Sequence, residues 1–214
     1  MKTTTALAVP IVMDEGDRFL RAEETLPDQV YRCPACQETL IRKAGSRKIL
    51  HFSHRGQTDC NGETALHAAA KRTVYQVVTD WLAGKAEPPT IQGRCHGLSL
   101  VYEDEDLSWN SGWDCSALVK FPLRRDKVDE CVMEEPLEDG LLPDLTFRLN
   151  GKDILGIEIK VTHEVDSAKR ERLDIWWVEL DAGAVLQNRL DWKPRQHNIE
   201  KLRRCAFCSQ FDEG

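Results

Sequence analysis

The stretch LPDLTFRLNGKDILGIEIK, residues 142–160, decides the fold that we expect for this chain. Asn150-Gly151 is a strong hairpin signal, because both residue types tolerate the positive φ angles of a tight turn. Apolar side chains alternate on both sides of the turn, as in half-buried strands. They are Leu145, Phe147 and Leu149 before it and Leu155, Ile157 and Ile159 after it. Two antiparallel strands with one buried face are therefore predicted.

Two registers of this hairpin compete. A two-residue turn pairs Leu145 with Gly156, whereas a three-residue turn over residues 150–152 pairs Leu145 with Ile157. The second register keeps every apolar side chain on one face, and a slip of one residue would expose them. We therefore expect the three-residue turn.

The preferred register brings charged residues together on the opposite face. Asp144 then lies opposite Glu158 with Cβ atoms about 5 Å apart, and Lys160 points the same way two residues on. Two carboxylates this close repel each other unless they bind a hard cation such as Mg²⁺ or Mn²⁺, whose water can attack a phosphodiester while the lysine supports the transition-state charge. An ordinary amphipathic hairpin with a solvated polar face is the alternative interpretation.

Composition places the chain among globular proteins. Its 214 residues are 41% hydrophobic and 30% charged, enough for one domain with a small appendage. We expect a cytoplasmic protein without membrane contact, because no apolar run is long enough to span a bilayer and the N-terminal residues lack a basic region followed by a long apolar segment. The net charge of −7 argues against a generally basic nucleic-acid-coating protein. Local basic groups remain available for nucleic acid, at Arg42, Lys43, Arg47 and Lys48.

Eight cysteines, with two C-x-x-C pairs, predict structural zinc rather than disulfides in a chain without a signal peptide. Cys33 and Cys36 form the first pair, and two of His51, His54 and Cys60 would complete a tetrahedral shell. His51 and His54 could both bind, or His51 could pack while His54 and Cys60 bind. Because a segment this short cannot form a core of its own, metal would supply its stability.

The second C-x-x-C pair, Cys205 and Cys208, lacks two local partners. A second zinc would need distant ligands, and the choices are Cys95, His96, Cys115 and Cys131. Such a site would be a structural staple. A terminal pair of free thiols is the alternative.

The rest of the chain is α/β in character. Asn61 is the expected N-cap of a helix that reaches about Leu82 and ends before Gly84. Its expected core stripe consists of Leu66, Ala70, Val74, Val77, Val78 and Trp81. Another helix is expected over residues 164–173, and strands over residues 7–13, 39–42, 98–102, 117–121, 128–133 and 175–180. We expect Trp176 and Trp177 to pack in the core. Three domains follow: a strand segment with a zinc-ribbon-like module at 1–60, a core at 61–192 and a tail at 193–214.

The long helix carries Glu63, His67 and Lys71 at i, i+4 and i+8, and therefore along one face. By itself this row is typical of a solvated helix surface. Its position between two other motifs of the sequence makes it a candidate part of a site. Three features follow one another along the chain: CPAC at 33–36 with HFSH at 51–54, then this row, then Pro143-Asp144 with EIKVTHE at 158–164. Together they resemble the competence protein CoiA family over residues 30–181.

The resemblance implies a restriction-endonuclease-like core of the PD-(D/E)XK type, with a central mixed sheet flanked by helices, joined to the zinc module. In that superfamily Asp144, Glu158 and Glu63 would bind Mg²⁺ or Mn²⁺, and Lys160 would orient water or stabilise the phosphorane. His67 and Lys71 would contact the scissile phosphate. Glu135 would be a weaker metal ligand. His163 and Glu164 would not bind the metal themselves and would orient the residues that do.

We therefore expect a nuclease acting on DNA, in DNA processing, transformation or phage defence. A non-catalytic zinc-containing adaptor that binds nucleic acid or protein is the alternative from another class. It would bind through the basic loop around residues 42–48, with strong salt dependence and indifference to Mg²⁺. A ribonuclease or a branched-DNA nickase could use the same site.

Overall fold

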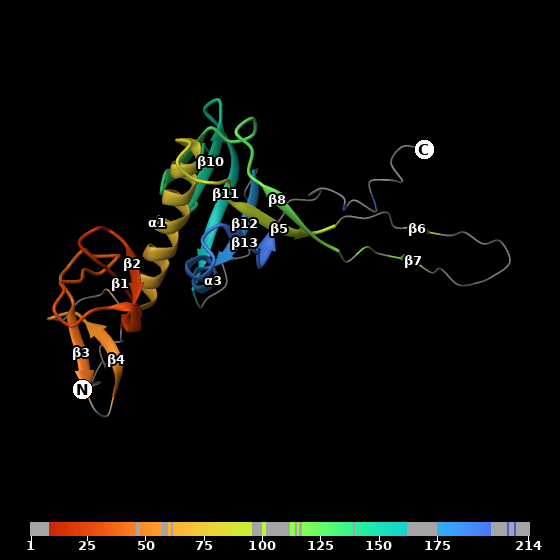
Figure 1. Ribbon diagram of the computed structural model, residues 1–214. Coiled ribbons are helices and arrows are strands. Elements are labelled where there is room, and N and C mark those ends of the chain that lie inside the picture. Colours follow the sequence, from red (N-terminus) through yellow and green to blue (C-terminus); the bar gives the residue numbers. More distant parts are fainter. Residues whose placement is uncertain are drawn as a thin grey trace.

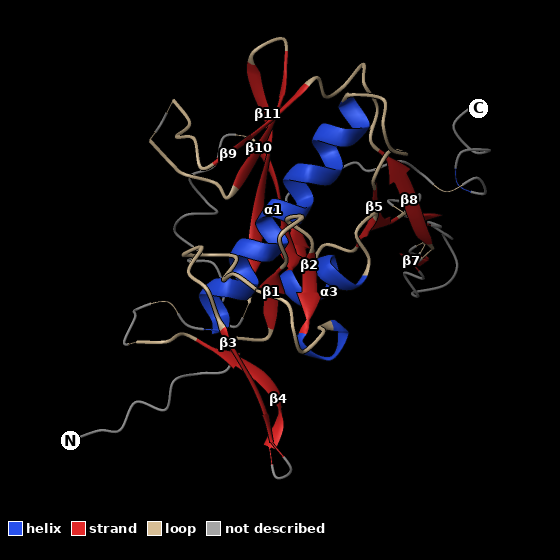
Figure 2. Ribbon diagram, turned by 60° about the vertical axis from the view of Figure 1, so that its left-hand side comes forward, coloured by secondary structure: helices blue, strands red, loops and turns tan. Residues whose placement is uncertain are grey.

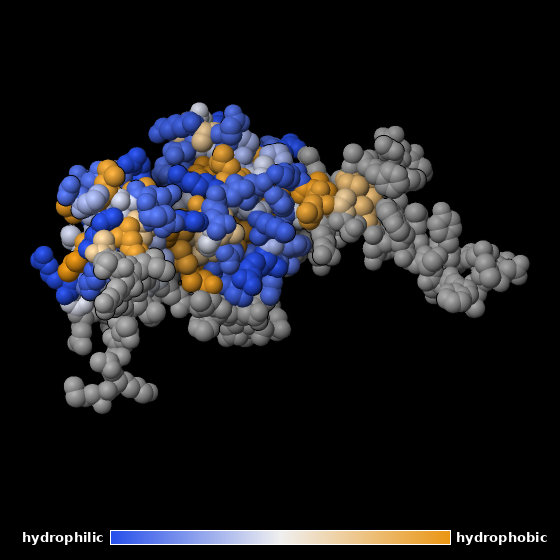
Figure 3. Space-filling view, turned by 60° about the horizontal axis from the view of Figure 1, so that its bottom comes forward, coloured by the Kyte–Doolittle hydropathy of each residue, from blue (hydrophilic) through white to orange (hydrophobic). Residues whose placement is uncertain are grey.

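A computed structural model describes the chain at residues 9–45, 48–56, 60, 62–95, 100–101, 112–113, 115, 117–138, 140–161, 175–197, 205 and 208 (Figure 1). The helix expected over residues 164–173 lies outside these residues, as do His163 and Glu164. The backbone of Glu63 is described and its side chain is not. Among the described helices, none has the length and apolar composition needed to cross a bilayer. On the face drawn in Figure 3, hydrophilic residues cover most of the described surface.

The N-terminal module consists of two small antiparallel hairpins at one end of the molecule (Figure 1). The first pairs β1 (Ile11–Met13) with β2 (Phe19–Arg21), which leads into a 3-10 turn, η1 (Ala22–Glu24), and the second pairs β3 (Ile41–Gly45) with β4 (Lys48–Ser53). Tyr31 and Phe52 meet edge to face, with ring centroids 5.3 Å apart. They lie in a small separate core that includes Val9, Val12, Cys33 and Leu40. The residues before Cys33 thus provide apolar packing that the cysteine segment alone could not.

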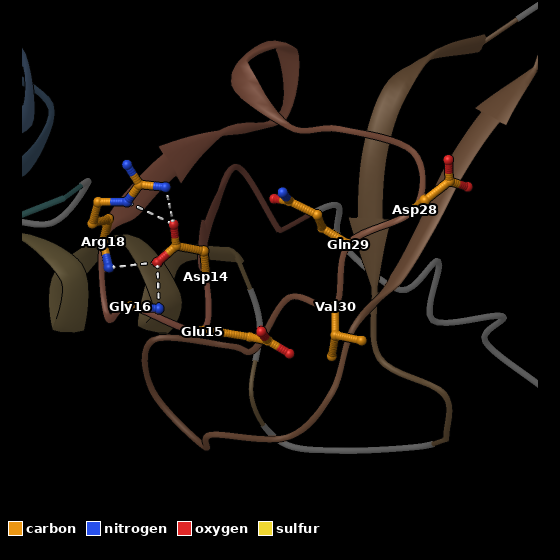
Figure 4. A pocket seen from close by; sticks show the side chains of 7 residues that line it. All are labelled: Asp14, Glu15, Gly16, Arg18, Asp28, Gln29 and Val30. Carbon is orange, nitrogen blue, oxygen red and sulfur yellow. Dashed lines mark hydrogen bonds and ion pairs between the residues drawn. The ribbon is translucent and has the colours of Figure 1, made fainter.

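Asp14 organises the turn between β1 and β2, beside an acidic cavity of about 310 Å³ (Figure 4). One carboxylate oxygen accepts the N–H groups of Gly16 and Arg18 at 3.0 and 2.9 Å, and the other accepts Arg18 Nε at 2.7 Å. Burial alone would raise the pKa of Asp14, but the hydrogen bonds from Arg18 and Gly16 and the Arg18 charge lower it overall.

Asp14 is therefore expected to make stability dependent on acid pH. Because its pKa is lower folded than unfolded, its contribution is complete at neutral pH and is lost as pH falls through the folded-state pKa. Asp14→Asn should lower the thermal midpoint of the N-terminal module at pH 7, and the gap from the parent should shrink toward pH 3. Asp28→Asn, in an exposed residue that lines the same cavity, is the control. A gap that is constant with pH would contradict this assignment.

The long helix α1 (Gly62–Leu82) joins the module to the main sheet and lies across it (Figure 2). Its expected apolar stripe is confirmed, since Ala70, Val74, Val77, Val78 and Trp81 are buried in the main core. Gly84, with φ 76°, lies just past its end. A positive φ at this position is the usual reason for a glycine after a helix.

The main sheet has five strands in the order β14-β12-β11-β10-β9. Only β11 and β12 are parallel among these pairs; the other neighbours are antiparallel. The strands are β9 (Glu130–Met133), β10 (Leu145–Leu149), β11 (Lys152–Lys160), β12 (Trp176–Asp181) and β14 (Gln196–His197). The described part of the chain is thus a mixed α/β fold dominated by sheets. A short helix that we did not predict, α3 (Ala182–Gln187), follows β12, where the Asp181 side chain accepts the Ala184 N–H at 2.9 Å.

A second sheet, in the order β13-β5-β8, lies beside the first (Figure 1). It contains β5 (Thr90–Arg94), β8 (Leu118–Pro122) and β13 (Asp191–Trp192), and Trp192 is buried against Phe147 of the main core. Beyond β5 and β8, the short strands β6 (Leu100–Val101) and β7 (Gly112–Trp113) pair in an arm that extends from the body (Figure 1).

Trp176 and Trp177 differ in their surroundings. Trp177 is buried, as expected, in a small cluster with Leu137 and Leu141. Trp176 is 61% exposed, so its assignment to the core was wrong. Neighbouring residues of a strand point to opposite faces, and only one of the two faces is covered at the start of β12.

The central hairpin combines the two registers that competed. Leu145 pairs with Ile157 and Phe147 with Leu155, as the apolar pattern predicted. The turn nevertheless has two residues, because Leu149 pairs with Lys152, and a register shift after Phe147 absorbs the extra residue Ile154. Asn150 and Gly151 have φ angles of 53° and 73°, as a type I′ turn requires. The expected three-residue turn is therefore wrong, and a β-bulge preserves the buried face.

Gly151 is expected to be sensitive to replacement for conformational reasons alone. An added Cβ would meet no atom within 4 Å, yet its φ of 73° disfavours any other residue. Gly151→Ala should lower the free energy of unfolding by about 1 kcal/mol, measured by denaturant titration with tryptophan fluorescence. Gly156→Ala in the same hairpin is the control, because its nearest contacts are ordinary ones at 3.6 Å. Equal losses from both variants would argue against the left-handed turn.

Candidate functional site

Four acidic residues lie at the same level of four neighbouring strands, and we call them the acidic row: Glu134, Asp144, Glu158 and Glu179. The pairing of Leu145 with Met133 and with Ile157 places Glu134 and Glu158 on either side of Asp144. Glu158 is directly paired with Glu179 across the parallel strands. The Glu134 N–H donates to the Asp144 carbonyl oxygen at 3.2 Å, which extends the pairing of β9 and β10 to this level.

The row becomes more buried from β9 toward β12. Glu134 is exposed, whereas Glu158 is 6% and Glu179 is 0% exposed. Neighbouring buried carboxylates raise each other's energy unless cations or protons compensate them. Cationic side chains do reach this row, from helix α1 and from β11.

Asp144 is held at the end of β10 by contacts from two sides. One of its oxygens accepts the Ile159 N–H at 2.8 Å and lies 3.0 Å from His67 Nε2. The other lies 3.9 Å from Lys71 Nζ. Burial alone would raise the pKa of Asp144, but the hydrogen bond and charge of His67, the Ile159 amide and Lys71 lower it overall. Asp144 is therefore a carboxylate at neutral pH.

Lys71 connects the helix to a residue that the sequence analysis did not select. Its ammonium group forms an ion pair with Glu134, whose backbone has φ 55°, unusual for a residue other than glycine. Glu135, the predicted weaker ligand, instead accepts a hydrogen bond from Arg148 Nη1 at 2.9 Å. Glu134, and not Glu135, is thus the residue that lies opposite Asp144 at the end of β9. The pairing of Leu145 with Met133 identifies it, because Glu134 follows Met133 as Asp144 precedes Leu145 in the antiparallel pair.

Glu179 is the second residue that the sequence analysis missed. The run WWVELD at 176–181 is typical of an apolar core strand. Glu179 nevertheless points to the same face of the sheet as Trp177, opposite to Val178 and Leu180. Lys160, itself only 5% exposed, has its Nζ 3.7 Å from Glu179 Oε1. Lys160 is therefore enclosed in the sheet beside a carboxylate.

Other predicted site residues are placed only in part. Glu63 lies in the first turn of α1, ahead of His67, and its side chain is outside the described atoms. Of the basic loop, Arg42 Nε lies 3.4 Å from Thr25 Oγ1 and Lys43 is exposed, while Arg47 and the side chain of Lys48 are not described. Among the described side chains, the groups of three or more ligand atoms within 4.8 Å are two cysteine clusters, and the acidic row is not among them.

The N-terminal cluster contains Cys33, Cys36, His54 and Cys60, with all ligand atoms within 4.8 Å of one another. Cys33 and Cys60 Sγ are 3.5 Å apart, and Cys36 Sγ is 3.2 Å from His54 Nε2. Of the alternatives left open by the sequence, the cluster contains His54 and Cys60, while His51 lies in β4 outside it.

Local backbone geometry forms the cysteine turn of this cluster. The Gln37 N–H donates to the Cys33 carbonyl oxygen at 3.0 Å, and Gln37 has φ 63°. Burial is the main cause that raises the pKa of Cys60 to about 12, and the neighbouring Cys33 raises it further. Thiols this crowded retain their protons until a cation neutralises them, so the cluster could hold a metal such as zinc.

The C-terminal cluster contains Cys95, Cys115, Cys205 and Cys208, again within 4.8 Å of one another. Of the four candidate distant ligands, the cluster contains Cys95 and Cys115. Cys131 is buried in the main core, and His96 lies outside the described residues. The hydrogen bond from the Cys208 backbone is the largest influence on Cys205 and lowers its pKa to about 7.

Comparison with known families supports the resemblance for the N-terminal part. Residues 19–63 match the family model of the competence protein CoiA N-terminal domain. This segment holds the N-terminal cluster and ends at the start of α1, so the acidic row lies outside the match. No curated protein matches the chain. No solved structure matches it either.

Proposed function

We propose that the protein is a metal-dependent nuclease that hydrolyses phosphodiester bonds, most readily in DNA. The observation that supports this most is the acidic row, in which Asp144 and Glu158 occupy paired positions and Lys160 lies two residues beyond Glu158. A structural ion-pair network alone would not need a nearly buried lysine and carboxylates at the ends of adjacent strands. Burying charged groups in this way costs desolvation energy, and a cation bound by the carboxylates would offset that cost.

Hard oxygen ligands suit Mg²⁺ or Mn²⁺. Asp144 and Glu158 would hold the ion, together with Glu63 from the first turn of α1. When bound, the ion supplies charge neutralisation and a more acidic water. Lys160 places a positive charge beside the reacting phosphate. His67 and Lys71, which contact Asp144, would bind phosphate oxygens once the cation binds the Asp144 carboxylate.

In the N-terminal cluster, three thiolates and one imidazole are the ligands that zinc prefers. A tetrahedral zinc with Zn–S of about 2.3 Å and Zn–N of about 2.0 Å needs S–S and S–N separations of about 3.5 to 3.8 Å. The observed 3.5 and 3.2 Å are close to these values. Zinc would brace the module, and the exposed Lys43 and its neighbours would add affinity for nucleic acid.

The decisive experiment offers the purified protein single-stranded, duplex and branched DNA and RNA, each with Mg²⁺, Mn²⁺ or EDTA. Cleavage of DNA that requires added Mg²⁺ or Mn²⁺ is the expected result. Cleavage confined to RNA or to branched DNA would change the proposed substrate class and would leave the proposed catalytic site unchanged. Salt-sensitive binding without any cleavage would overturn the proposal and favour the adaptor alternative.

A further inference from the structure

The C-terminal cluster unites three segments that are far apart in the sequence. Cys95 directly follows β5, and Cys115 precedes β8, its antiparallel neighbour. The Cys95 N–H donates to the Ala117 carbonyl oxygen at 2.8 Å, so the pairing of these strands continues up to the cluster. Cys205 and Cys208 come from the tail of the chain. The cluster therefore lies next to the end of the β5–β8 pair formed by Arg94 and Leu118.

The sulfur positions match a four-coordinate ion better than a disulfide. A tetrahedral zinc with Zn–S bonds of about 2.3 Å separates its sulfurs by about 3.8 Å. Cys115 and Cys205 Sγ are 3.7 Å apart, and all four sulfurs lie within 4.8 Å of one another. A disulfide would require about 2.05 Å, and none of the eight cysteines forms one.

Backbone amides point at the sulfurs, as they do around metal-bound thiolates. The Cys205 N–H donates to Cys95 Sγ at 3.0 Å, and the Cys208 N–H donates to Cys205 Sγ at 3.5 Å. Four thiolates carry two more negative charges than Zn²⁺ can neutralise. Amide donors stabilise that excess charge and orient the ligands.

We propose that Cys95, Cys115, Cys205 and Cys208 bind one structural Zn²⁺, which fastens the tail of the chain to the base of the arm. The site is independent of the N-terminal cluster and differs from it in ligand class, with four sulfurs instead of three sulfurs and one nitrogen. Soft thiolates select zinc over Mg²⁺, so this ion and the ion of the proposed nuclease do not compete for ligands.

Zinc bound at the C-terminal cluster would close a long loop of the chain, because the stretch between Cys115 and Cys205 contains β8 to β14. Closing a loop of this size restricts the unfolded chain strongly. The second sheet is also tied to the main core through Trp192. Loss of the zinc should therefore lower the thermal midpoint without dismantling the main core.

Zinc content measured by elemental analysis tests the proposal. The parent chain is expected to contain two zinc ions, and Cys205→Ser with Cys208→Ser is expected to contain one. Cys33→Ser with Cys36→Ser should also contain one, by losing the other ion. Cys131→Ala should keep both, because Cys131 lies in the main core outside the two clusters. A C-terminal double variant with as much zinc as the parent would overturn the proposal.

A second measurement on the parent protein covers the case in which the double variant does not fold. Alkylation followed by peptide mass spectrometry, during slow removal of zinc by a chelator, should label Cys95, Cys115, Cys205 and Cys208 only as one zinc ion is released. Labelling of these cysteines while both ions remain bound would overturn the proposal. Nuclease assays of the same samples are read separately, because a failed nuclease assay leaves the zinc count unchanged.

Discussion

Lys160→Met is expected to reduce the rate of metal-dependent DNA cleavage by a factor of about 100 to 1,000, the usual loss when one charge that stabilises a transition state is removed. Methionine retains much of the lysine stem, so the side-chain volume changes little, but Glu179 loses its cationic neighbour and the thermal midpoint of the variant must be measured alongside its activity. The loss should therefore appear in kcat rather than in the affinity for DNA. Single-turnover cleavage of a labelled duplex, with binding measured in parallel, separates the two quantities.

The matched control for this variant is Lys152→Met. Lys152 lies on the same strand β11, at its exposed start, and pairs with Leu149 next to the turn. It should cleave DNA at the parental rate. Asp144→Asn, which preserves the volume of the side chain, should lose activity as Lys160→Met does. Parental cleavage by both Lys160→Met and Asp144→Asn would refute the proposed function.

His54→Ala is expected to release zinc from the N-terminal cluster and to unfold residues 9–56 while the main sheet remains folded. The small core around Tyr31 and Phe52 is the only apolar cluster among the described residues of this module. The binding free energy of structural zinc, about 10 to 16 kcal/mol, exceeds what so few apolar contacts contribute. Hydrogen exchange measured by mass spectrometry should show fast exchange over β1 to β4 and slow exchange over β10 to β12.

His51→Ala provides the comparison for that experiment. His51 lies in β4 only three residues before His54, and it is not among the four clustered ligands. This variant should retain its zinc and the slow exchange of the module. If the two histidine variants lost zinc equally, the ligand set Cys33, Cys36, His54 and Cys60 would be wrong.

The features predicted well from the sequence are those set by local periodicity. The stripe of α1, the glycine after it and the apolar face of β10 and β11 all depend on residues close in the chain. The short elements β5, β13 and α3 were missed, because two to six residues carry too little pattern. The exposure of Trp176 depends on what covers the sheet there, which no local pattern encodes.

The candidate site was predicted where one hairpin contains it and missed where other strands contribute. Asp144, Glu158 and Lys160 lie within 17 residues of each other along the chain. Glu134 and Glu179 join them only through the pairing of β9 with β10 and of β12 with β11. The choice of His54 over His51, and of Cys95 and Cys115 as partners of the tail cysteines, likewise required folded positions rather than spacing.

The bulge at Ile154 divides the hairpin into two segments with different pairing registers. Between the bulge and the acidic row, the pairing of Phe147 with Leu155 aligns Asp144 with Glu158; beyond it, the turn follows its own two-residue geometry. Changes at the tip are thus absorbed before they reach the charged residues. We therefore expect that the tip can be lengthened by pairs of residues, or that a tag can be inserted at Asn150-Gly151, without misaligning the opposite end.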